Sequence, residues 1–141
     1  LTDPKRHIMI GIRGMMSTSQ PYDWARDNGV TVLTPDDVED LGTKGVIQKI
    51  REVVGDGPTY VTYDLDGLDP VYAPGTGMPE PGGLSTQTSL RILRGLQGLD
   101  IIGGDVNEIA PPFDPQGYTA IVVNHLMFEM LCLIAISRSN R

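Results

Sequence analysis

The most constraining feature of this sequence is a run of 17 residues, 67–83, that holds five glycines and four prolines. Proline lacks the backbone N–H that helices and central strands require, and interior glycines weaken both elements, so this run forms neither. Its prolines also restrict the backbone, which favours an ordered loop over a flexible linker. Any fold adopted by this chain must therefore accommodate one long, fairly rigid loop.

Short apolar strands and amphipathic helices alternate on both sides of this loop. Hydrophobic periodicity and β-branched content predict strands over residues 7–13, 30–33, 59–64 and 99–106. Helical spacing and capping residues predict helices over residues 22–28, 44–54, 85–96 and 118–136, and residues 34–37 (TPDD) form a further helix-start signal. Near-continuous apolar strands that alternate with helices indicate an α/β fold, a three-layer α/β/α architecture with a mainly parallel sheet.

Charge and cysteine content exclude several classes of protein. The chain has 11 Lys and Arg against 18 Asp and Glu, and its net charge of −7 favours cationic ligands over nucleic acid. The single cysteine, Cys132, excludes an internal disulfide and a cysteine-rich zinc site. The longest apolar stretch is interrupted by Asn124, His125 and Glu129, so we expect no membrane span.

Two of the predicted strands end in acidic residues. Asp64 and Asp66 lie at the end of one strand, and Glu108 follows another. Ligands of open parallel sheets bind outside the carboxyl ends of the strands. Asp64 and Asp66 are two residues apart, so in extended backbone their carboxylates emerge on one side and favour a hard divalent cation between them. The alternative is that both are solvated loop residues.

Two better-known acidic motifs do not fit this pattern. The nucleophile motif of haloacid-dehalogenase-type phosphatases requires a later lysine, whereas every lysine here precedes Asp64. A calcium-binding EF-hand requires a ligand and a glycine where this chain has Leu68 and Asp69. The acidic pair therefore calls for a different interpretation.

The residues around the acids carry a family resemblance. Residues 64–84 (DLDGLDPVYAPGTGMPEPGGL) resemble the C-terminal signature of the ureohydrolases, which include arginase, agmatinase and other guanidino-compound amidinohydrolases. Residues 103–114 (GGDVNEIAPPFD) resemble the later acidic motif of that family, and residues 10–13 (IGIR) resemble an upstream strand. The APGTG segment at 73–77 favours the agmatinase-like branch. The resemblance covers about residues 7–137.

The resemblance implies an enzyme that acts on C–N bonds in linear amidines. Such an enzyme hydrolyses a guanidino compound, agmatine-like in this branch and linked to polyamine metabolism, to urea and an amine. It implies a binuclear manganese centre, with nickel as the alternative, in which paired metals activate a bridging water as hydroxide. By position, Asp64 would bridge both metals, Asp66 would bind one, and Glu108 would hold the substrate guanidinium. We expect structural roles for the other acids of these motifs: Asp69, Asp105 and Asp114.

The family's remaining metal ligands are missing from this sequence. Two histidines and two aspartates belong to motifs resembling GGDHS and DAHxD, and neither motif is present. The only histidines, His7 and His125, lie at a strand start and within the last helix, and we expect neither to bind metal. We therefore expect residues 1–141, which lack an initiator Met, to be the C-terminal portion of one ureohydrolase domain carrying half of the site. The alternatives are a noncatalytic or partner-dependent subunit and an unrelated α/β domain.

The same interpretation sets expectations for partners. The substrate is a small guanidino cation, nucleic acid and membranes are not partners, and the full-length enzyme is a homo-oligomer. The expected location is the cytoplasm, or the mitochondrion in a eukaryote, and no targeting segment is visible. Met15, Met16 and Ser17 either line the substrate pocket or serve only in packing.

Overall fold

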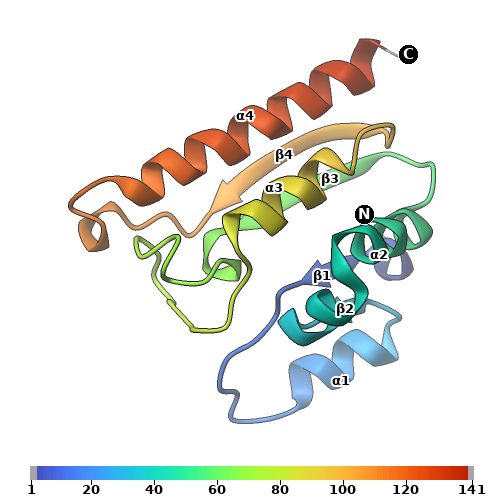
Figure 1. Ribbon diagram of the computed structural model, residues 1–141. Helices are drawn as coiled ribbons and strands as arrows, with labels where there is room; N and C mark the ends of the chain where they lie inside the picture. The colour runs from blue at the N-terminus through green and yellow to red at the C-terminus, as the bar shows by residue number, and fades with distance from the viewer. Residues whose placement is uncertain (1–2, 140–141) are drawn as a thin grey trace.

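The computed structural model describes residues 3–139, in which strands and helices alternate along the chain (Figure 1). The four strands are β1 (Ile8–Ile10), β2 (Thr31–Leu33), β3 (Thr59–Asp64) and β4 (Ile101–Asn107). The four α-helices are α1 (Gln20–Asp27), α2 (Pro35–Val54), α3 (Thr86–Arg94) and α4 (Tyr118–Ser139). Three short 3₁₀ turns complete the regular structure: η1 (Pro4–Arg6), η2 (Leu65–Gly67) and η3 (Pro111–Phe113).

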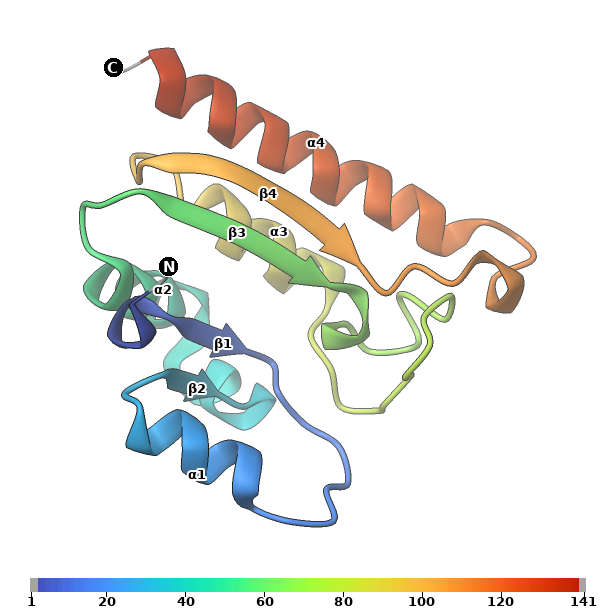
Figure 2. The same cartoon turned by 180° about the vertical axis from the view of Figure 1, so that it is seen from behind.

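The strands pair in parallel, as the sequence predicts. β1 pairs with β2 and β3 pairs with β4, and all four strands point the same way (Figure 2). Within residues 3–139 they form two separate two-stranded sheets, not one continuous sheet. In both views β1 and β3 are the strands that face the space between the two pairs. The predicted α/β class is therefore correct, and the sheet is divided in two.

Helices cover the strands in layers. α1 and α2 lie on opposite sides of the β1–β2 pair (Figures 1 and 2). α2 packs against β1, β2 and α3, while α4 packs against β4 and α3. One hydrophobic cluster joins the two strand pairs, and it includes Leu33, Val46, Leu65, Leu68 and Leu126. The packing of α2 on α3 thus connects the two sheets.

Local sequence signals explain where α2 begins and where β1 ends. The Thr34 side chain accepts the Asp37 N–H at 3.2 Å, and the Asp37 carboxylate accepts the Thr34 N–H at 2.8 Å, which forms a capping box. α2 therefore starts at Pro35, as the helix-start signal at residues 34–37 predicts, and it bends at Gly42, where φ is 62°, before the apolar-periodic part predicted over residues 44–54. The strand predicted over residues 7–13 is shorter, because Gly11 at φ 85° leaves the extended region.

The last helix is apolar on nearly every side. α4 is long and apolar enough to cross a membrane by length and composition alone. It buries Leu126, Met130 and Leu133 against the rest of the chain. Several large apolar side chains on the same helix remain exposed: Tyr118, Ile121, Met127, Phe128 and Leu131. A helix that is hydrophobic all round belongs either to the core of a larger protein or to a membrane, and length and composition alone do not distinguish the two.

The capping box of α2 gives a prediction about stability. Replacing Thr34 by alanine leaves the Asp37 N–H without its acceptor at the start of the helix, and we expect it to lower the free energy of unfolding by about 1 kcal/mol. Urea denaturation of the full-length protein, followed by circular dichroism, measures the change. Thr34→Ser keeps the hydroxyl and should be nearly neutral; equal losses in both variants would contradict the role of the cap.

Candidate metal and substrate site

Asp64 and Asp66 lie together at the carboxyl end of β3. Asp64 is the last residue of the strand, and its carboxylate accepts the backbone N–H of Asp66 at 3.3 Å across the η2 turn. Leu65, fully buried between them, anchors the turn in the core. The Asp64 side chain is exposed and Asp66 is half-buried. Two carboxylates thus face solvent from one fixed turn.

The electrostatics of this turn favour a cation. Burial and then the negative charge of Asp64 raise the pKa of Asp66, and Glu108 acts in the same direction, while Arg13 opposes them. Three negative groups therefore interact at this edge of the sheet. A carboxylate close to other carboxylates ionises fully only when a positive charge offsets their repulsion.

Strand pairing brings Glu108 to the same edge. Asp64 lies directly opposite Asn107 in the β3–β4 register, and Glu108 is the next residue. Its φ of 60° is the only positive φ of a non-glycine residue within residues 3–139. A side chain in that backbone region costs on the order of 1–3 kcal/mol, and such strain concentrates at functional sites. A Cβ atom at Gly77 would come 3.3 Å from the Glu108 carboxylate, so the glycine leaves space beside it.

The loop over residues 67–83 is ordered by contacts at its tip. The Ala110 N–H donates to the Gly75 carbonyl at 2.8 Å, and the Gly75 N–H donates to the Thr119 hydroxyl at 2.9 Å. A Cβ atom at Gly75 would lie 2.7 Å from that of Asp114, so only glycine fits there. The loop after β3 is therefore fixed to the segment that follows Glu108.

Three further acids have structural roles, as expected. The Asp69 carboxylate accepts the N–H groups of Val71 and Gly82, and these bonds, led by that of Val71, lower its pKa. Buried Asp114 accepts the N–H of Thr119 at 2.6 Å at the start of α4. Half-buried Asp105 on β4 accepts hydrogen bonds from side chains of the sheet, and these bonds, led by that of Tyr60 and followed by that of Thr62, lower its pKa.

The donor set suits a divalent metal, but too few ligands are present. Carboxylate oxygens are the donors that hard divalent cations prefer. No group of three or more His, Cys, Asp or Glu side chains within residues 3–139 is placed to hold a metal ion. His7 precedes β1 and is exposed, and His125 lies on α4. Asp64 and Asp66 thus fit one side of a metal centre and do not complete it.

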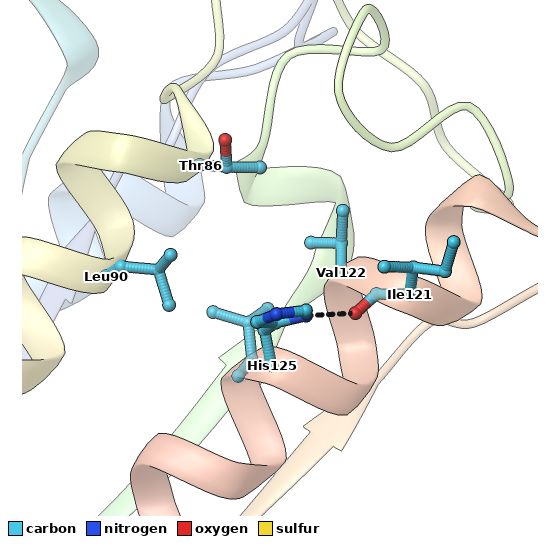
Figure 3. Close-up of a pocket in the computed structure, with 6 residues that line it drawn as sticks. Thr86, Leu90, Ile121, Val122 and His125 are labelled. Carbon is cyan, nitrogen blue, oxygen red and sulfur yellow. Dashed lines mark hydrogen bonds between the residues drawn. The ribbon is translucent and has the colours of Figure 1, made fainter.

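A separate pocket of about 180 Å³ lies between α3 and α4 (Figure 3). The His125 ring nitrogen Nδ1 is 2.9 Å from the Ile121 carbonyl oxygen one turn earlier in the same helix. The remaining lining residues are mainly apolar: Thr86, Leu90, Val122 and Leu126. None of the predicted site residues lines this pocket, so it is distinct from the acidic edge.

Two side chains beyond those predicted organise the site. Arg13 donates to carbonyl groups of the 67–83 loop, and Thr119 binds its tip. In the sequence, Arg13 is a charged residue directly after an apolar strand, and this is the one local feature that indicates a special role for it. No local feature indicates a special role for Thr119. Met15 is 99% exposed and Met16 is 45% exposed, so neither side chain is packed within the described residues.

Comparisons with known proteins agree with these motifs. Residues 1–132 match the model of the arginase family. Guanidinopropionase from Pseudomonas aeruginosa is 47% identical over 135 residues, 96% of this chain and 42% of that protein. Mitochondrial agmatinase from Gallus gallus is 42% identical over 134 residues, 95% of this chain and 39% of that protein.

A solved structure shows a similar arrangement of the chain. Proclavaminate amidino hydrolase from Streptomyces clavuligerus superposes with a TM-score of 0.89 and 41% identity, covering 96% of this chain and 44% of that structure. The predicted three-layer α/β/α fold is thereby confirmed. This chain spans less than half the length of each of these relatives.

The interaction between Asp64 and Asp66 predicts a measurable change in the pKa of Asp66 when Asp64 is replaced. Changing Asp64 to asparagine removes one of the charges that raise the pKa of Asp66, so the pKa of Asp66 should fall in metal-free full-length protein. Carboxyl-carbon NMR across a pH series measures it. Protons compete with metal for the same oxygens, so metal affinity of the unaltered protein should decrease as pH falls through the pKa of Asp66. An unchanged pKa of Asp66 in Asp64→Asn would contradict the proximity of the two groups.

Proposed function

This chain belongs to the arginase family, and we propose that it carries one half of the active site of a metal-dependent, agmatinase-like hydrolase. The proposed reaction adds water across the guanidino carbon of a small cationic substrate and breaks a C–N bond, and it yields urea and an amine. The relatives named guanidinopropionase, agmatinase and amidino hydrolase support this reaction class.

One observation carries the proposal. The parallel register that sets Asp64 opposite Asn107 brings a pair of metal-binding carboxylates and the strained Glu108 to one edge of the sheet. The family motif occupies the same positions. A site with two kinds of acid, one for a metal and one for a cationic substrate, is what guanidino hydrolysis requires.

Each of these side chains has a distinct proposed role. Asp64 and Asp66 would hold manganese, or nickel, as carboxylate ligands, with the bridging position expected for Asp64. When bound, such ions lower the pKa of water and so supply a nucleophile near neutral pH. Glu108 accepts the forked N–H groups of the guanidinium, in the paired geometry that arginine and carboxylates adopt, and orients the guanidino carbon. Gly77 leaves room for the substrate beside that carboxylate.

We propose that the remaining ligands come from a segment that precedes this region in a longer protein. Within residues 3–139 β1 pairs only with β2 and β3 only with β4, so each of these strands leaves one edge unpaired toward the other pair. Unpaired strand edges invite a further strand. The exposed apolar side chains of α4, among them Phe128 and Leu131, also call for a covering layer. Both features support a chain that is part of a larger domain.

Several finer points of the proposal follow from the same interpretation. Exposed Met15 and Met16, after β1, are available to line the pocket for the distal end of the substrate. The full-length enzyme is proposed to be a homo-oligomer without nucleic-acid or membrane partners. Its location is proposed to be the cytoplasm, or the mitochondrion as in the name of the Gallus gallus relative.

Substitutions at the two kinds of acid should separate their roles. In the full-length enzyme Glu108→Gln should lower kcat/KM for guanidino substrates by about 10- to 100-fold, because it removes a charged hydrogen-bond acceptor. Its metal content, measured by elemental analysis, should stay nearly unchanged. Asp64→Ala should lose metal first and activity as a consequence.

A matched control keeps this comparison specific. Glu39→Gln, on the exposed surface of α2, should alter neither metal content nor urea release. Loss of metal in Glu108→Gln would make Glu108 a ligand and would reverse the assigned roles.

The division of the site predicts the behaviour of the isolated chain. Residues 1–141 alone, supplied with manganese, should release no urea from a panel of guanidino compounds, because Asp64 and Asp66 do not complete a metal site. The full-length protein should release urea under the same conditions. Circular dichroism checks that the isolated chain is folded. Full activity of the isolated chain would refute the half-site. If the full-length protein released urea only after a second polypeptide was added, the alternative of a partner-dependent subunit would hold.

A further inference from the structure

Arg13 makes an unusual set of contacts at the end of β1. Its guanidinium donates to the carbonyl oxygens of Leu68 at 3.1 Å and Pro81 at 3.2 Å, and also to that of Glu80. A fourth and longer bond, 3.4 Å, reaches the Gly11 carbonyl in the preceding turn. One half-buried side chain therefore binds backbone from two distant segments.

These contacts close the base of the 67–83 loop. Leu68 lies on the arm that leaves η2, while Glu80 and Pro81 lie on the arm that returns toward α3. Arg13 joins both arms to the end of β1. The base is crowded as well, because a Cβ atom at Gly83 would come 2.7 Å from the Arg13 guanidinium.

The loop therefore has two attachments with the proposed site between them. At the base, Arg13 binds the carbonyl of Leu68, only two residues after Asp66. At the tip, Gly75 is bonded to Ala110, two residues after Glu108. The loop connects the metal-binding turn with the substrate-binding acid, and Arg13 fixes the end that carries the metal-binding turn.

We propose that Arg13 is a positioning residue that holds the Asp66 turn in its metal-binding geometry. The inference rests on the proposed function. The hydrogen bonds of Arg13 reach only backbone carbonyls, so it acts through the backbone of the loop, beside the effect of its charge on Asp66. Arginine suits this role because its planar guanidinium offers five N–H donors in a fixed fork, whereas lysine offers three donors on a flexible stem.

The test compares Arg13 with a second arginine that also donates to backbone carbonyls, far from the proposed site. Arg51 also binds two backbone carbonyls, those of Gly95 at 2.8 Å and Gln97 at 2.6 Å, after α3 and before β4. Arg13→Lys and Arg51→Lys in the full-length enzyme each weaken one such anchor. The measurement is the dissociation constant for Mn²⁺ in the absence of substrate, from metal titration of the demetallated protein followed by electron paramagnetic resonance.

We expect Arg13→Lys to raise the Mn²⁺ dissociation constant by about 10- to 100-fold, the usual effect of removing a group that orients metal ligands. Arg51→Lys should leave it unchanged even where both variants lose similar thermal stability. Arg13→Gln, which keeps a planar amide without the charge, gives a second variant, and the affinity order should be wild type, then Lys, then Gln.

The possible outcomes separate this inference from the proposed function. If the wild type binds Mn²⁺ and both Arg13 variants bind it equally well, the positioning role is refuted while the proposed function stands. An equal loss of affinity in Arg51→Lys refutes it too, because a general loss of stability would explain the result. A wild-type enzyme that binds no Mn²⁺ and releases no urea overturns the proposed function itself.

Discussion

The parallel pairing of β3 with β4 is the interaction on which the rest of the site depends. Its register sets Asp64 opposite Asn107, so acids separated by more than 40 positions in the sequence meet at one edge. The backbone bonds of the ladder fix that register, and the alternating exposure along β3 shows that one of its faces is committed to the core. A slip of one residue would turn Asp64 toward the core and Tyr63 toward solvent. The register that serves packing therefore also serves the chemistry.

The glycine- and proline-rich loop, residues 67–83, links the end of β3 to the segment that follows Glu108. Gly75 approaches Asp114 too closely for any side chain, and its N–H finds the Thr119 hydroxyl. Such contacts fix a loop that would otherwise lose much conformational entropy on ordering, and prolines reduce that loss in advance. The strained backbone of Glu108 lies beside this loop tip. The bond from the Ala110 N–H to the Gly75 carbonyl fixes the backbone two residues after Glu108, whose side chain is exposed.

Sequence reasoning recovered the elements that local signals define. β3 has the predicted bounds, 59–64, because a β-branched and aromatic run ends at an acid, and Ser85 caps α3 as expected. The strand predicted over residues 7–13 is longer than β1, because the positive φ of Gly11 is set by tertiary structure and not by the local sequence. The bonds of Arg13 join segments more than 50 residues apart, and no local pattern encodes such contacts. The roles of Asp64, Asp66 and Glu108 remain predictions of the motif, although their placement at one edge agrees with it.

Within residues 3–139 the edges of β1 and β3 that face each other are unpaired, which agrees with the proposed half-site. Parallel sheets gather ligands from the ends of several strands, so a chain that holds only some of those strands gathers only some of the ligands. At Asp66, burial and then the charge of Asp64 raise the pKa, and the charge of Arg13 offsets this only in part. A metal ion would reverse that balance, since it favours the ionised form that the neighbouring charges disfavour. In the proposed function, folding holds the two carboxylates close together, and a bound metal ion would offset their repulsion.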